Sequence, residues 1–193
     1  KGETLHWDIL RLWGDIQHGL TAAGKLAGGS LAGIGVDTWG VDFGLLDGAG
    51  HLLGNPVHYR DGRTNGMLEI ACARVPRAEI FAQTGIQFMA INTLYQLLAL
   101  VQTRAPEIDQ AQTLLTIPDL LNYWLTGVAV NEFTNATTTQ CFNPLTGAWA
   151  RDLLVGLGIP LGLLGSIVQP GTALGPLRSG LAEALGLGQV PVI

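Results

Sequence analysis

Polar side chains follow a short apolar stretch in the sequence GVDTWGVDF, residues 35–43. Carboxylates such as Asp37 and Asp42 accept hydrogen bonds from hydroxyl groups, and the indole of Trp39 offers an apolar face to C–H groups. Ligands of open α/β sheets bind beyond the carboxyl ends of strands, and Gly40 allows a ligand to approach the backbone. These residues could therefore bind a sugar. Taken alone, they are explained more simply as a turn in which Asp37 caps the backbone and Trp39 fills the core.

A second polar group is HYRDGRT, residues 58–64, where an apolar stretch runs into a turn with two guanidinium groups. Arg60 could pair with Asp61, or Arg60 and Arg63 could bind hydroxyl or phosphate oxygens. A solvated loop with a local salt bridge is the simpler interpretation.

Uncharged polar residues form the next group. Gln87 and Asn92 stand on either side of Phe88 in the sequence GIQFMAIN, which suits contacts with a sugar. Thr93 follows directly and is expected to cap the helix that begins there.

Two further polar segments have local structural explanations. Asp119 stands in the first turn of a predicted helix, where the helix dipole alone favours a carboxylate. The asparagine and threonines of FTNATTT, residues 133–139, are expected to bond to their own backbone.

Composition excludes several function classes. The chain has 193 residues, 10 basic and 15 acidic, and no run of Lys or Arg. Binding to nucleic acid or to an anionic membrane is therefore disfavoured, because both need a basic surface. No apolar run reaches the ~20 residues that span a bilayer. Two cysteines and no leader sequence favour a reduced, cytoplasmic protein.

Nucleotide and metal motifs are missing from the sequence. Neither GxxxxGK[ST] nor a strand-linked GxGxxG is present, and the four histidines lack metal-ligand spacing. No metal site is expected in this chain.

Alternating strand and helix patterns predict an α/β fold, a sheet with helices on its faces. Strands are predicted at 31–37, 41–46, 52–59, 113–117 and 190–193. Helices are predicted at 8–25, 65–74, 77–83, from Thr93, at 118–125, 149–157 and 179–186.

Five blocks in order, VDTWGVDFGLLD, YRDGRTNG, TGIQFMAINTLYQLLAL, IPDLLNYWLTG and EFTNATTTQCFNPLTGAW, resemble the FGGY family of carbohydrate kinases, and most closely its L-rhamnulose kinases. The resemblance covers essentially all 193 residues. It implies an actin-like, ribonuclease-H-like domain with a mixed sheet and helices on both faces. Residues 1–193 would be part of the N-terminal, sugar-holding domain, truncated at both ends, without its first strands and without the C-terminal ATP-binding domain.

The resemblance also implies which residues bind substrate. Gly40, Val41 and Asp42 match the stretch that contacts the sugar, and Tyr59 matches the aromatic residue that lines the pocket. The polar pocket wall of the family falls near Gln87 and Asn92.

Family chemistry is phosphoryl transfer from MgATP to a sugar hydroxyl, here to give L-rhamnulose 1-phosphate in rhamnose catabolism. The resemblance places the catalytic Asp beyond Ile193 and the phosphate loop before Lys1. We therefore expect no catalytic residue in this chain, ATP and Mg²⁺ only in the parent protein, and no kinase activity of the chain alone.

Two alternatives stay open. The parent could phosphorylate another ketose or a polyol, or the chain could be a non-catalytic sugar-binding or regulatory module of the same fold. The expected unpaired sheet edge could also join two copies into a homodimer.

Overall fold

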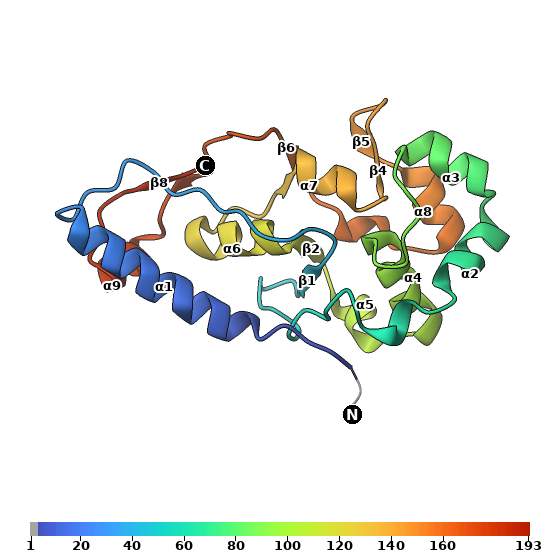
Figure 1. Cartoon of the computed structure of the whole chain (residues 1–193), viewed down its shortest axis with the longest axis horizontal. Helices are drawn as coiled ribbons and strands as arrows, with labels where there is room; N and C mark the ends of the chain where they lie inside the picture. The colour runs from blue at the N-terminus through green and yellow to red at the C-terminus, as the bar shows by residue number, and fades with distance from the viewer. Residues whose placement is uncertain (1–3) are drawn as a thin grey trace.

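The computed structural model describes residues 4–193 as an elongated α/β molecule (Figure 1). The helices are α1 (Ile9–Leu26), α2 (Met67–Arg74), α3 (Arg77–Thr84), α4 (Thr93–Thr103), α5 (Pro106–Gln110), α6 (Ile117–Thr126), α7 (Phe133–Thr138), α8 (Arg151–Leu157) and α9 (Ser179–Leu185), with 3₁₀ turns at Gly62–Thr64 and Leu161–Leu163. The strands are β1 (Phe43–Leu46), β2 (Thr113–Thr116), β3 (Asn131–Glu132), β4 (Phe142–Asn143), β5 (Ala148–Trp149), β6 (Ile167–Val168), β7 (Gly175–Pro176) and β8 (Pro191–Val192).

Local signals explain most helix limits. The Asp8 carboxylate accepts a hydrogen bond from the Arg11 backbone N–H at the start of α1 (3.2 Å). Pro118 stands in the first turn of α6, and Gly127, at φ +83°, ends that helix. Two short helices, α5 and α7, were not predicted because neither is long enough to show a helical period.

The α/β class is confirmed, but its strands are shorter than predicted. β1 and β2 pair antiparallel over four residues, from Phe43–Thr116 to Leu46–Thr113. Every other strand pair in residues 4–193 is two residues long. The strands predicted at 31–37 and 52–59 are wrong, and only single bridges remain there: Ile34–Val192, Leu46–Leu52 and His6–Val57. Glycines at 33 and 35 and Pro56 explain the loss, because glycine weakens a strand and proline cannot donate to a ladder.

Three apolar clusters form the core. The largest surrounds α4, whose Leu94, Leu97 and Leu98 are fully buried; α4 packs against α2, which in turn packs against α8. A second joins α9 and β8 to Ile34, and a third packs α6 against β1 and β2. The β1–β2 pair lies between the two ends of the molecule (Figure 1).

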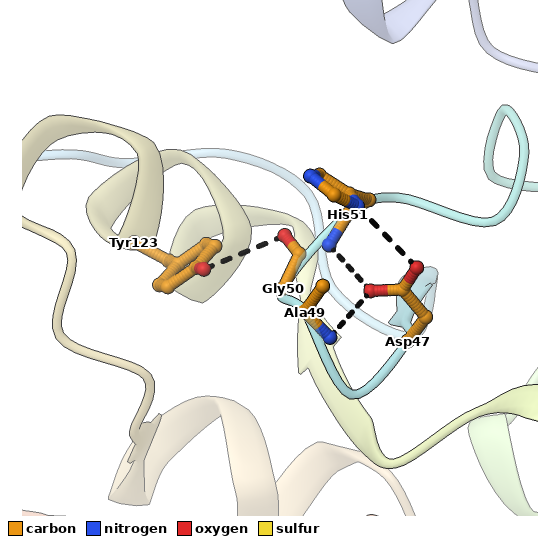
Figure 2. A network of polar contacts seen from close by, with 5 residues as sticks. All are labelled: Asp47, Ala49, Gly50, His51 and Tyr123. Carbon is orange, nitrogen blue, oxygen red and sulfur yellow. Dashed lines mark hydrogen bonds and ion pairs between the residues drawn. The ribbon is translucent and has the colours of Figure 1, made fainter.

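A tight turn closes β1 (Figure 2). The Asp47 carboxylate accepts hydrogen bonds from the backbone N–H groups of Ala49 (2.9 Å) and His51 (2.8 Å). The bond from His51 is the main cause that lowers the pKa of Asp47. Tyr123 of α6 reaches the turn and donates to the Gly50 carbonyl at 3.4 Å. The turn thereby fixes β1 relative to α6.

Candidate functional site

The Asp42 carboxylate is the centre of a buried hydrogen-bond network. Its Oδ2 accepts from the indole N–H groups of Trp7 (2.6 Å) and Trp39 (3.0 Å) and from the Tyr59 backbone N–H (3.2 Å). Its Oδ1 accepts from Gln96 Nε2 at 3.0 Å. Asp42 has no exposed surface. Asp42 was predicted to contact the sugar. In the structure it is buried, and its carboxylate holds other side chains in position.

Val41, next to it, has an unusual backbone. Its φ is +68°, a left-handed value that is costly for a β-branched residue. Two side chains of α4 hold this conformation: Thr93 Oγ1 and Gln96 Nε2 both donate to the Val41 carbonyl, at 2.7 and 3.2 Å. Because strained backbone is typical of functional sites, this turn is the strongest structural mark of a site in the 35–43 stretch.

Gly40 packs closely against α7. A Cβ atom on Gly40 would lie 3.4 Å from Thr138 Oγ1 and 3.9 Å from Asn135 Oδ1. A larger side chain would therefore fill the space between this turn and α7.

Aromatic rings line one side of the network. Ring centroids of Trp39 and Trp7 are 4.1 Å apart, those of Trp7 and His58 are 4.2 Å apart, and those of His58 and Tyr59 are 4.5 Å apart. The Arg60 guanidinium lies 5.5 Å from the Tyr59 ring centre. The half-buried Tyr59 thus belongs to a row of four rings that could face the C–H groups of a sugar.

Gln87 and Asn92 occupy a different place. Asn92 is 1% exposed, and its Nδ2 donates to the Gln87 carbonyl and to Gln140 Oε1, both at 2.9 Å. The exposed Gln87 side chain lines a hollow with Phe88 and Arg77, whose guanidinium lies 4.0 Å from the Phe88 ring centre. Asn92 therefore holds the 87–92 loop together, and among the described residues no hydrogen bond joins either side chain to Gly40–Asp42.

Two smaller expectations are wrong. Thr93 does not cap α4: Asn92 is the N-cap, without a side-chain bond, and the Thr93 hydroxyl binds Val41 instead. The salt bridge between Arg60 and Asp61 is absent from residues 4–193. The Asp61 carboxylate instead accepts from the backbone N–H groups of Leu5 and Arg63, at 2.8 and 2.9 Å.

Arg63 itself points toward α4. Its guanidinium donates to Gln96 Oε1 at 2.5 Å, and burial lowers the pKa of Arg63. Gln96 therefore connects Arg63 with Asp42 and Val41. Its role was missed, although a polar side chain inside the apolar pattern of TLYQLLAL is a signal that could have identified it.

Asp119 does more than complement a helix dipole. It is 3% exposed and accepts hydrogen bonds from Thr116 Oγ1 (2.6 Å), Asn131 Nδ2 (3.2 Å) and the Glu132 backbone N–H (3.1 Å). Burial raises the pKa of Asp119 to about 6 despite these bonds. Asp119 thus connects the end of β2 with β3, a link that the sequence did not reveal.

Within residues 4–193, no three His, Cys, Asp or Glu side chains are grouped so that they could hold a metal ion. None of the helices in that range is both long and apolar enough to span a membrane.

A family model described as "FGGY family of carbohydrate kinases, N-terminal domain" matches residues 1–193. The chain belongs to this family. It is 42% identical over 181 residues to a protein of Oceanobacillus iheyensis named rhamnulokinase, covering 94% of this chain and 38% of that protein. A rhamnulokinase of Bacteroides thetaiotaomicron is 40% identical over 192 residues, and the match covers 100% of this chain and 39% of that protein. The chain thus spans under two fifths of the length of these curated relatives.

Solved structures share the fold. A gluconate kinase from Lactobacillus acidophilus has a TM-score of 0.90 at 24% identity, covering 100% of this chain and 39% of that one. A Plasmodium falciparum glycerol kinase has a TM-score of 0.86 at 18% identity, and the match covers 100% of this chain and 40% of that chain. These likenesses support the actin-like fold expected from the sequence.

Proposed function

We propose that the whole protein is a cytoplasmic, ATP-dependent kinase that phosphorylates L-rhamnulose to L-rhamnulose 1-phosphate, and that this chain holds the sugar. Family membership and 40–45% identity to proteins named rhamnulokinase support the proposal. The observation that carries it is the strained Gly40–Asp42 turn, because three predicted sugar-contacting residues coincide with the most constrained backbone of the 35–43 stretch.

The proposed roles combine the resemblance to the family with the contacts described above. Gly40 and the Val41 backbone contact the sugar, and Tyr59 presents an aromatic face to it. Asp42 acts as a positioning residue, because its oxygens are occupied by protein donors. Fixed contacts of this kind favour phosphoryl transfer by orienting the acceptor hydroxyl. None of these residues is proposed to bind ATP or Mg²⁺ or to act as the catalytic base. We assign those functions to segments outside this chain.

A coupled kinase assay on the whole protein tests the proposal. We expect kcat/KM for L-rhamnulose to exceed that for D-xylulose, gluconate and glycerol by at least about tenfold, since a site that hydrogen-bonds one set of hydroxyls discriminates against others. A higher value for another acceptor would instead support a kinase for a different ketose or polyol. Sugar binding without ATP turnover would support the non-catalytic module.

We also propose that two copies of the chain associate through an unpaired sheet edge. The strands of residues 4–193 form two-stranded sheets, so each strand keeps an edge that could pair with a partner strand. Light scattering should give the mass of a dimer, and a monodisperse monomer would contradict the proposal.

A further inference from the structure

A cavity of about 240 Å³ opens beside α7, on the side of Gly40. Its polar lining comes from three carboxylates, three amides and two hydroxyls: Asp37, Asp119, Glu132, Asn122, Asn135, Gln169, Thr134 and Thr172. Lys, Arg and His are absent from the residues that line it. We call this the acceptor cavity, because every charged side chain in its lining is a carboxylate.

Two of the carboxylates are already occupied. Asp119 accepts three hydrogen bonds from the protein, as described above. Glu132 caps α7, where its carboxylate accepts from the backbone N–H groups of Thr134 (2.8 Å) and Asn135 (2.9 Å). These two side chains therefore shape the cavity wall, and the acceptors left for a ligand include Asp37, Asn122 and Asn135.

Two of the amides, Asn122 and Asn135, have an unused acceptor. Asn122 is 9% exposed, and its Oδ1 is buried with no hydrogen-bond partner in residues 4–193. Asn135 Oδ1 is also buried and has no hydrogen-bond partner in that range. A buried acceptor that lacks a donor destabilises the fold. Two such atoms in one cavity indicate that a donor-bearing ligand completes them.

The cavity also lies where the fold places ligands. Ile34 and Val192 pair in parallel, and the residues that follow them, Val36, Asp37 and Ile193, all line the cavity. Ligands of α/β folds bind beyond the carboxyl ends of parallel strands. Asn135 Oδ1 lies only 3.9 Å from the position of a Cβ on Gly40, so the cavity adjoins the Gly40–Asp42 turn.

The chemistry of the free acceptors narrows the class of ligand that the cavity can bind. An anion is excluded by Asp37 and by the lack of a basic side chain in the lining, and the described residues do not group as metal ligands. A polyol matches, because each hydroxyl can donate to one acceptor. We infer that the acceptor cavity binds hydroxyl groups of the sugar, and that Asn135 is a specificity-determining residue that accepts from one of them. This inference rests on the proposed function.

Nuclear magnetic resonance on the ¹⁵N-labelled 193-residue chain tests the site. On titration with L-rhamnulose, the side-chain amide signals of Asn122 and Asn135 and the backbone signal of Asp37 should shift together. Shifts confined to Tyr59, Gln87 and Asn92, or no shifts at all, would overturn the inference. Shifts produced by ammonium, K⁺ or Mg²⁺ but not by the sugar would also overturn it.

Kinetics on the whole protein separate this inference from the proposed function. Asn135→Ala should raise KM for L-rhamnulose about tenfold and leave KM for ATP unchanged. Asn55→Ala, an exposed asparagine outside the cavity, is the matched control and should change neither. An unchanged sugar KM in Asn135→Ala would refute the inference while the kinase assignment stands. If D-xylulose is the better substrate and its KM responds to Asn135→Ala, the cavity stands and the choice of L-rhamnulose fails.

Discussion

The two ends of the molecule pack differently, although both are helical (Figure 1). In the α4 lobe, formed by α2, α3, α4 and α8, seven of the 11 residues of α4 are buried, from Thr93 to Ala99. At the α1 end, formed by α1, α9, β7 and β8, only Ile9 and Gly24 of the 18 residues of α1 are buried. The apolar period predicted a helix at both ends of the molecule. Only the α4 lobe buries its helix in a closed core.

An open apolar groove explains the difference. A hollow of about 580 Å³ lies between α1, residues 34–39 and α6, lined by Leu12, Ile16, Leu20, Leu121 and Leu125 among others. Leu10 and Leu26 of α1 are 62% and 90% exposed. The α1 end should therefore contribute less to stability and open more readily than the α4 lobe.

The largest effect is expected in the α4 lobe. Leu98→Ala removes a fully buried side chain from the main cluster, and should lower the free energy of unfolding by about 2–5 kcal/mol. Urea unfolding followed by circular dichroism measures the change. A loss smaller than about 1 kcal/mol would mean that the α4 lobe is not the more stable region.

A pH effect of up to about 3 kcal/mol is expected at Asp119, between the two ends. Burial raises its pKa from 3.8 to about 6, so the folded protein binds this proton more tightly than the unfolded chain. The Asp119 contribution to the free energy of unfolding should therefore fall as pH rises from about 4 to about 6. Unfolding curves across this range should show a smaller fall in Asp119→Asn. The same fall in both proteins would contradict the assignment.

Two glycine substitutions compare the turn after β1 with the exposed helix α1. Gly50→Ala should destabilise by about 1–3 kcal/mol, because φ is +81° and the new Cβ would lie 2.2 Å from the Tyr123 hydroxyl. Gly19→Ala in α1 is the matched control: its Cβ meets nothing within 4 Å, so it should stabilise by about 0.5–1 kcal/mol. Thermal unfolding of both variants measures the effects, and shifts in the same direction would refute this contrast.

The smallest effect is expected in the groove. Leu20→Ala should cost less than about 1 kcal/mol, because its side chain is only partly buried. The same urea experiment applies. A cost equal to that of Leu98→Ala would show that the groove is closed in solution and would contradict this expectation.

Local patterns predicted what depends on local physics. The helix at Thr93 followed from its apolar period, and the threonines of α7 bond their own backbone as expected, with Thr138 Oγ1 donating to the Asn135 carbonyl at 2.8 Å. The prediction that Gly40 and Val41 contact the sugar came from the resemblance to a family, and it stays a prediction. Local patterns failed at 31–37, where an apolar stretch rich in glycine forms only one bridge.

The inside of the site could not be predicted from spacing. Two donors to the Asp42 carboxylate, Trp7 and Gln96, are 35 and 54 residues away in the sequence. Only the fold brings them together. Buried acceptors such as Asn122 Oδ1 are likewise a property of packing, and a sequence pattern does not distinguish them from capping residues.

The central claim is that this chain carries a preformed sugar site at the Gly40–Asp42 turn. Calorimetric titration of the 193-residue chain with L-rhamnulose, with fructose and glycerol as controls, tests it most directly. The account predicts binding of L-rhamnulose alone, and loss of that binding in Gly40→Val, whose side chain would fill the space before α7. No heat with L-rhamnulose, or unchanged binding in Gly40→Val, would contradict it.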